Sequence, residues 1–149
     1  MPPKRKDRKK RVIVPPKKIG GGLSKAKGVL NSLPHTSLNN IQLASFAKKL
    51  RISNFRGVYM RDTLPNKPQE KECAILNLDE SCSSGSHWVA YRKNGLYVRY
   101  FDSLGNRGPP KELVRYLKGC RITFNCKAYQ SPLSYLCGHL CLLFLLNLL

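Results

Sequence analysis

The sequence contains few acidic residues. It has 8 Asp and Glu against 27 Lys and Arg in 149 residues, which gives a formal net charge of +19. The imbalance is not confined to one end: residues 1–27 hold eleven basic and one acidic residue, and residues 28–149 hold sixteen and seven. Since residues 28–149 are basic even without the N-terminal segment, the charge favours a polyanionic partner, most simply nucleic acid. The first 27 residues could also be a nuclear-localisation or solubilising arm.

The chain also lacks an apolar N-terminal segment and a long hydrophobic run. Its start is charged, which excludes a secretory signal of the usual kind. We therefore expect an intracellular setting, the nucleus or a virion, in which the six cysteines are reduced thiols. The apolar run over 140–149 is about half the roughly 20 residues that a membrane span needs, so we expect a buried helix and no membrane partner. The sequence also has no internal repeat, no Gly-rich phosphate loop and no paired-carboxylate motif. This argues against a repeat protein, a phosphate-loop nucleotide-binding protein and an enzyme that uses two carboxylates.

The length suits one domain with a modest core, and we expect a monomer. We interpret residues 1–36 as a basic, disordered extension and residues 37–149 as the folded domain. Within the extension, a short helix over 23–33 stays open. Apolar residues at helical spacing predict a helix after the capping residue Asn39. The order of the elements predicts an α+β fold, with strands at 54–60, 73–78, 87–93, 96–102 and near 122–128, a short helix over 110–117 and an apolar helix from Cys137.

A hairpin brings two of the four catalytic candidates together. Asn94-Gly95 is a strong signal for a two-residue turn. If these two residues form the loop, His87 lies directly opposite Asp102, and directly opposed side chains are roughly 5 Å apart at Cβ. A carboxylate at that distance can accept the imidazole N–H.

Cys137 begins the apolar helix, and a helix N-terminus lowers the pKa of a thiol and offers backbone N–H groups to an oxyanion. We expect Gly138 to leave room for a substrate backbone. Gln130, seven residues earlier, could supply a second oxyanion donor. Each residue can also be interpreted without a catalytic role: Cys137 as part of the core, His87 as a solvated surface group, and Asp102 and Gln130 as loop residues.

Three motifs together resemble the adenovirus-type (adenain-like) cysteine proteases. They are Gly85-Ser86-His87-Trp88, Tyr100-Phe101-Asp102-Ser103-Leu104-Gly105, and Gln130 followed by Cys137-Gly138. The resemblance covers roughly residues 37–149. The family has relatives in virus-like Polinton/Maverick elements and shares a clan with the ubiquitin-like-protein proteases.

The resemblance implies a papain-like or adenain-like core, in which a central, mostly antiparallel sheet packs against the helix that carries the nucleophile. It implies that His87 is the general base, Asp102 its orienter, Cys137 the nucleophile and Gln130 the oxyanion donor. Trp88 matches an aromatic residue that packs near the site. No cofactor is then needed for the chemistry itself.

The same resemblance implies an endopeptidase that cleaves viral or virus-like structural precursor proteins, with DNA and a short basic peptide as activators. Cys120 looks like the cysteine that forms a disulfide with that peptide, and Cys126 competes for the role. Leu136 stands where ubiquitin-like-protein proteases usually have Asp, which disfavours that branch. The chain ends twelve residues after Cys137, so the domain is expected to be short at its C-terminus.

Three alternatives stay open. The first is a deconjugating protease of the deubiquitinase or deSUMOylase kind. The second is a catalytically inactive, nucleic-acid-binding virion protein. The third is a zinc site built from Cys137, His139 and Cys141 with Cys120 or Cys126, which is disfavoured because two-residue spacings in a helix point to different faces.

Overall fold

The computed structural model describes residues 20–149, so the first 19 residues of the predicted extension lie outside the described part. The helices and strands follow the predicted order closely, and the helix left open over 23–33 is present, beginning three residues earlier. In chain order they are α1 Gly20–Asn31, α2 Asn40–Lys49, β1 Phe55–Met60, β2 Lys71–Asn77, β3 Trp88–Asn94, β4 Tyr97–Phe101, α3 Lys111–Tyr116, β5 Arg121–Phe124 and α4 Cys137–Leu145.

The five strands form one sheet in the order β1-β2-β3-β4-β5. The central strand β3 pairs with β2 and with β4 in antiparallel fashion, whereas β1 pairs with β2 and β5 with β4 in parallel. The α+β class is therefore confirmed, but the sheet is mixed rather than mostly antiparallel. Parallel neighbours need a crossover connection, and α3 lies in the crossover from β4 to β5.

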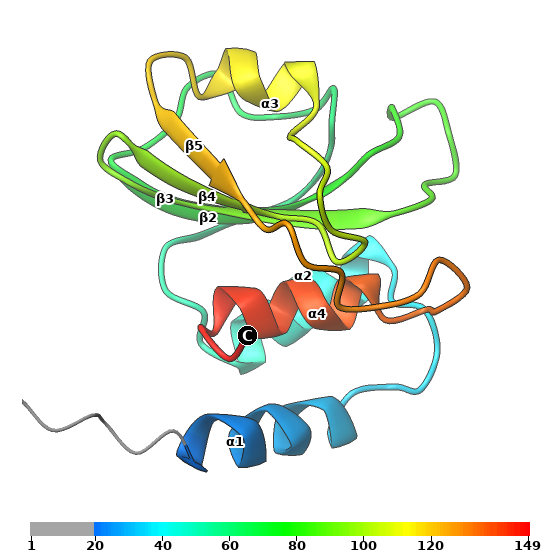
Figure 1. The fold of residues 1–149 in the computed structure, drawn as a ribbon. Coiled ribbons are helices and arrows are strands. Elements are labelled where there is room, and N and C mark those ends of the chain that lie inside the picture. The colour runs from blue at the N-terminus through cyan, green and yellow to red at the C-terminus, as the bar shows by residue number, and fades with distance from the viewer. Residues whose placement is uncertain (1–19) are drawn as a thin grey trace, which may run out of the picture.

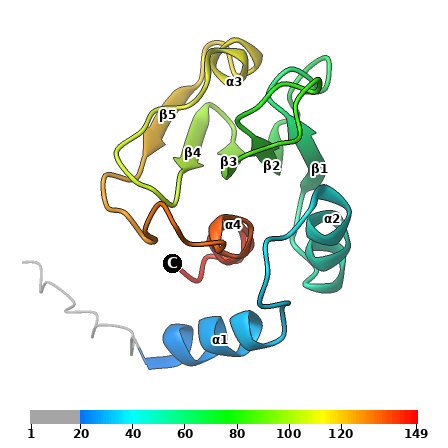
Figure 2. The same cartoon turned by 90° about the vertical axis from the view of Figure 1, so that its right-hand side faces the viewer.

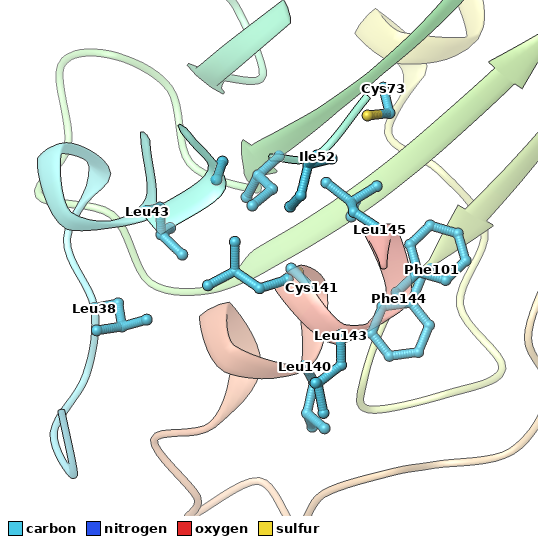
Figure 3. Close-up of a cluster of buried hydrophobic side chains, with 14 of the residues drawn as sticks. Leu38, Leu43, Ile52, Cys73, Phe101, Leu140, Cys141, Leu143, Phe144 and Leu145 are labelled. Carbon is cyan, nitrogen blue, oxygen red and sulfur yellow. The ribbon is translucent and has the colours of Figure 1, made fainter. Parts of the chain in front are cut away.

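The helices lie on both faces of the sheet (Figures 1 and 2). α3 covers one face, α2 and α4 cover the other, and α1 lies beyond α4, farther from the sheet. As predicted, α4 is a buried helix, with eight of its nine residues buried. Its side chains meet those of the sheet and of α2 in one apolar cluster, in which the Phe101 and Phe144 rings stack at 4.9 Å (Figure 3).

The structure corrects the boundary of the predicted extension, because α1 is a helix within residues 1–36. Ala26 and Leu33 are 7% and 3% exposed and belong to the same apolar cluster as α4. Beyond α1, the Pro34 carbonyl accepts a hydrogen bond of 2.7 Å from His139 Nε2 of α4. The glycines and lysines of this segment suggested disorder, but its few apolar residues are stabilised by tertiary packing, which outweighs local propensity.

The hairpin also differs from its prediction. Asn94 pairs with Tyr97, so Gly95 and Leu96 are the loop residues and the predicted register is wrong by two positions. Gly95 has φ +60°, while Asn94 is not among the residues with positive φ. Glycine at the first loop position is the requirement of a type II′ turn, whereas Asn-Gly as the loop would need positive φ at both residues.

A carboxylate that the sequence did not single out is buried beneath α3. Glu72 of β2 is 1% exposed, and its two oxygens accept four hydrogen bonds. The donors are Arg56 at 2.7 Å, the Gln69 backbone at 2.7 Å, the Tyr91 hydroxyl at 2.6 Å and the Tyr116 hydroxyl at 2.8 Å. These bonds join β1, β2, β3 and α3, which fixes the sheet on the side away from α4.

Candidate active site

Cys137 is the first residue of α4, as predicted, and it is half-buried. The first N–H groups of a helix have no partner within the helix. At the N-terminus of α4, beside Cys137, they are therefore free to donate hydrogen bonds. At the other end of α4, the Arg92 guanidinium of β3 donates a hydrogen bond to the Leu145 carbonyl. A cation at the C-terminus suits the helix dipole, and this contact ties the helix that carries the thiol to the middle of the sheet.

His87 and Asp102 are in direct contact. His87 Nε2 donates a hydrogen bond of 2.8 Å to Asp102 Oδ1, because a carboxylate can only accept. The side chain of His87 is 13% exposed and that of Asp102 is 1% exposed. With Nε2 engaged by Asp102, the other ring nitrogen, Nδ1, is left for the thiol. The predicted contact between base and orienter is thus present, although the register that suggested it is not.

The thiol and the imidazole shift each other's pKa in opposite directions. Burial acts to raise the pKa of Cys137, but the hydrogen bond with His87, the backbone N–H groups of Trp88 and Gly138 and the charge of His87 outweigh it, so that the pKa is lowered. Burial acts to lower the pKa of His87, but the hydrogen bonds and charges of Asp102 and Cys137 raise it to about 9. Each group of the pair therefore favours the charged form of the other, a thiolate beside an imidazolium.

Two other cysteines provide a contrast. Burial raises the pKa of Cys73 to about 11 and that of Cys141 well above the ordinary value. Cys141 lies one turn after Cys137 on the same helix and is fully buried. Being a cysteine in α4 is therefore not enough for reactivity. The position at the helix start, beside His87, is what makes the difference.

The acid is held by its own loop. Asp102 Oδ1 also accepts the Leu104 N–H at 2.9 Å, and the Asp102 carbonyl accepts the Gly105 N–H at 2.9 Å. The backbone N–H groups of Tyr129 and Gln130 donate to the Ser103 carbonyl at 2.7 and 3.2 Å. Gln130 is therefore joined to the acid loop through its backbone. Its side-chain Oε1 is buried and has no partner within residues 20–149.

Gly105 lets these two loops lie against each other. Its φ is +75°, and a Cβ at this position would come within 2.5 Å of the Ala128 backbone nitrogen. An L side chain rarely adopts that φ, and backbone atoms cannot move aside as a side chain can. The glycine of the Asp102-Ser103-Leu104-Gly105 motif is therefore what allows the segment that leads to Gln130 to approach the acid.

A cleft opens beside the thiol. It has a volume of about 420 Å³, and Cys137 and Trp88 line it together with residues 37–40 and the serine-rich loop 81–86. The lining carries hydroxyl and amide groups and no charged side chain. An uncharged segment of extended polypeptide fits such a lining better than a charged one.

Two polar side chains that sequence reasoning missed fix the wall of the cleft. Asn77 Oδ1 accepts the Asp79 and Ser86 N–H groups at 3.0 and 3.2 Å, so it closes the loop at both ends. Asp62 accepts the N–H and the hydroxyl of Ser81 at 2.8 and 2.7 Å, and the hydroxyl bond is the main cause that lowers the pKa of Asp62. No local pattern signals these roles, because the partners are up to 19 residues apart.

Gly138 does not have the role predicted for it. It is buried, and a Cβ there would lie 3.1 Å from Leu43 and 3.4 Å from Trp88. The absence of a side chain therefore serves the packing of α4 on α2 and β3 and leaves no room for a substrate backbone. Trp88 lies near the site, as the resemblance implies: it lines the cleft, and its Nε1 donates a hydrogen bond of 2.9 Å to the Leu38 carbonyl.

The structure does not bring Cys120 to the site. Cys120 is half-buried and packs with the apolar cluster under α3, on the face of the sheet away from α4, whereas Cys126 is exposed. Within residues 20–149, no group of three or more His, Cys, Asp or Glu side chains could hold a metal ion. In the same range no helix is long and apolar enough to cross a membrane.

The chain matches no protein-family profile and no curated protein sequence. Its structure is similar to a solved structure described as "SUMO protease Ulp1 with the catalytic cysteine oxidized to a sulfinic acid". The TM-score is 0.47 and the identity 15%, over 89% of this chain and 85% of the other.

Proposed function

We propose that the protein is a cysteine endopeptidase in which Cys137 is the nucleophile, His87 the general acid and base, and Asp102 the residue that orients His87. One observation supports this most strongly. Cys137 stands at the start of α4 with its pKa lowered by His87, and His87 in turn donates a 2.8 Å hydrogen bond to the buried Asp102. A nucleophile, a base and an orienting group in this order are the requirements of covalent acyl transfer.

The reaction follows from the protonation states of the pair. The Cys137 thiolate attacks the carbonyl carbon of a peptide bond, and the carbonyl electron pair moves onto oxygen. When the intermediate collapses, the C–N bond breaks and the leaving amine takes the proton from His87. His87 then accepts a proton from water, which attacks the thioester and releases the acid. The thiolate and the imidazolium are regenerated, and Asp102 keeps the ring in one tautomer throughout.

The developing oxyanion would be stabilised by the backbone N–H of Cys137 and the side-chain amide of Gln130. The N–H belongs to the first turn of α4, where backbone donors are unpaired. Gln130 is anchored beside the acid by the bond from its backbone to Ser103. Losing one oxyanion donor typically lowers kcat by about a hundredfold to a thousandfold.

For the substrate, we propose structural precursor proteins of a virus or virus-like element, cleaved in association with DNA in the nucleus or the particle. The charge supports the association with DNA, since residues 28–149 alone hold sixteen basic and seven acidic residues. Within residues 20–149, Arg56 and Arg61 are the only Lys or Arg side chains paired with a carboxylate. Activation by a basic peptide through Cys120 belongs to the same proposal, and the exposed Cys126 is the second candidate.

The test combines an active-site probe with peptide hydrolysis. The purified chain is treated with a thiol-directed electrophilic peptide and assayed on a library of internally quenched peptides, with and without duplex DNA over a salt series. We expect Cys137→Ala to abolish labelling and hydrolysis. Cys73→Ser should preserve both, because Cys73 does not line the cleft and a hydroxyl can still donate to the Ser53 carbonyl. Labelling that persists in Cys137→Ala would contradict the proposal.

The same assay separates the alternatives. Cleavage of ubiquitin-like conjugates without cleavage of internal peptides would favour a deconjugating protease. DNA binding that weakens with salt, with no labelling of Cys137, would favour an inactive nucleic-acid-binding protein. Stimulation of hydrolysis by DNA would favour the precursor-cleaving enzyme.

A further inference from the structure

We propose that Asn125 is a positioning residue that clamps the backbone of Asp102 and so holds the acid against His87. The inference rests on the proposed function, in which Asp102 orients the base. It assigns a role to a side chain that lies outside the four residues of the proposed chemistry.

One side chain satisfies both backbone groups of the acid. Asn125 Oδ1 accepts the Asp102 N–H at 3.0 Å, and Asn125 Nδ2 donates to the Asp102 carbonyl at 2.7 Å. The second hydrogen of Nδ2 goes to the Lys127 carbonyl at 2.9 Å. Only an amide of this length can accept one bond and donate two from the same position.

The clamp lies where the sheet stops. The pairing of β4 with β5 ends at Tyr100 and Phe124, and Asn125 follows directly. Beyond that point the Asn125 side chain replaces the next rung of the ladder, and its backbone carbonyl accepts the Asn106 N–H at 3.0 Å. Asp102 is thus held in line with β4, although it is outside the strand.

Holding this backbone fixes the carboxylate. Asp102 is 1% exposed, and Oδ1 already accepts bonds from His87 and from the Leu104 backbone. If the backbone shifts, the carboxylate shifts with it, and charge-assisted hydrogen bonds weaken steeply with distance and angle. The imidazolium of His87 then loses part of the interaction that stabilises it.

The clamp also reaches the segment that carries Gln130. The bond to Lys127 fixes the chain three residues before Gln130, and the bond from the Gln130 N–H to Ser103 fixes its end. Asn125 therefore holds two parts of the site in one arrangement, the acid and the segment of the oxyanion donor.

Two substitutions and one control test the role. Asn125→Ala removes all three bonds. Asn125→Ser keeps a neutral polar group, but its single hydroxyl cannot bond to both backbone groups of Asp102 and to the Lys127 carbonyl. The control is Thr123→Val, in the same sheet-edge strand, which removes a single 3.4 Å bond to the Val98 carbonyl.

The measurements are an NMR titration of the His87 ring, kcat and KM on a cleaved peptide, and thermal unfolding. In the unmodified protein we expect His87 to titrate near pH 9. In both Asn125 variants the midpoint should move toward the ordinary value of 6.5. The kcat should fall about tenfold to a hundredfold with little change in KM, as for other supporting partners of a catalytic group. Thr123→Val should leave the midpoint and kcat in place.

The proposal is overturned if the Asn125 variants are folded and His87 titrates where it does in the unmodified protein. If Asn125→Ala does not fold, Asn125→Ser decides, because it adds no charge and leaves a polar group beside the Asp102 backbone. The titration needs no turnover, so the two proposals can fail separately. A chain without peptidase activity whose His87 midpoint moves in both variants contradicts the proposed function and supports the clamp.

Discussion

His87 Nε2 lies 2.8 Å from Asp102 Oδ1, although neither residue belongs to a strand and the two are not directly opposite each other. His87 immediately precedes β3, and Asp102 immediately follows β4. The hairpin brings both to the same end of the sheet, where the first turn of α4 presents Cys137. The site is therefore assembled at the ends of three elements whose middles are buried in the core.

The pH dependence of hydrolysis should report this contact. The pKa of His87 is raised to about 9, so the imidazolium and the stability it contributes are fully present below the ordinary value of 6.5 and are lost as the pH rises through about 9. We expect kcat/KM to fall on the alkaline side with a midpoint near 9. In Asp102→Asn the midpoint of this alkaline fall in kcat/KM should move toward pH 6.5. A midpoint that stays near 9 would show that Asp102 does not act on His87.

Replacing Gly105 should damage the fold and the site together. Ala at this position combines φ +75° with a Cβ 2.5 Å from a backbone nitrogen, whereas Gly119 has φ +85° and open space around it. Gly119→Ala therefore measures the conformational cost alone, about 1–2 kcal/mol. We expect Gly105→Ala to lower the free energy of unfolding by at least about 1–3 kcal/mol more, because the loop must move. Equal losses in urea unfolding would contradict the close approach.

Glu72 should matter for stability although it is far from the thiol. Burial acts to raise its pKa, but the bonds from Tyr91, Gln69, Tyr116 and Arg56 outweigh it and the pKa is lowered. Its contribution is present above the unfolded value and lost as the pH falls through the folded one. Glu72→Gln should cost about 2–4 kcal/mol at neutral pH, and the difference should shrink in acid.

The matched control for that experiment is Glu80→Gln. Glu80 pairs with Arg61 at 3.2 Å, but its side chain is 49% exposed, so the change should be within about 1 kcal/mol. Similar losses for the two variants would mean that the network beneath α3 adds no more than a surface ion pair.

The segment over 20–36, which holds α1 and the turn after it, should prove to be part of the core. Leu33, just after α1, is 3% exposed and belongs to the same apolar cluster as α4, so Leu33→Ala should cost about 2–4 kcal/mol. Leu23, on α1 but 67% exposed, should change stability by less than about 0.5 kcal/mol when replaced by Ala. If both substitutions were neutral, this segment would not stabilise α4.

Most of the fold could be predicted from local patterns. The hairpin shows why the contact between His87 and Asp102 could be predicted as well. The turn was assigned to Asn94 and Gly95, and the loop is Gly95 and Leu96. A shift of two residues in register keeps every side chain on its face of the sheet. His87 and Asp102 therefore remained close enough to meet at the end of the hairpin, and a shift of one residue would have separated them.

The parts that could not be predicted depend on distant partners. Glu72 looks like an exposed residue at the edge of a strand, because Arg56, Tyr91 and Tyr116 come from segments 16–44 residues away. Asn125 lies 23 residues from Asp102, and nothing in its neighbourhood marks it as a partner of that residue. The first helix could only be left open over 23–33 for the same reason, since its stability comes from α4 at the other end of the chain.

The central claim is that Cys137 and His87 form an ion pair, and the rate of alkylation of Cys137 as a function of pH tests it most directly. The measurement uses iodoacetamide with mass spectrometry of the Cys137 peptide, in the unmodified protein and in His87→Gln. We predict an alkylation midpoint below the ordinary thiol value of 9.0 in the unmodified protein and a clear rise in His87→Gln, because the main interaction that lowers the pKa is removed. A Cys137 that titrates at or above 9, unchanged by the loss of His87, would contradict the account.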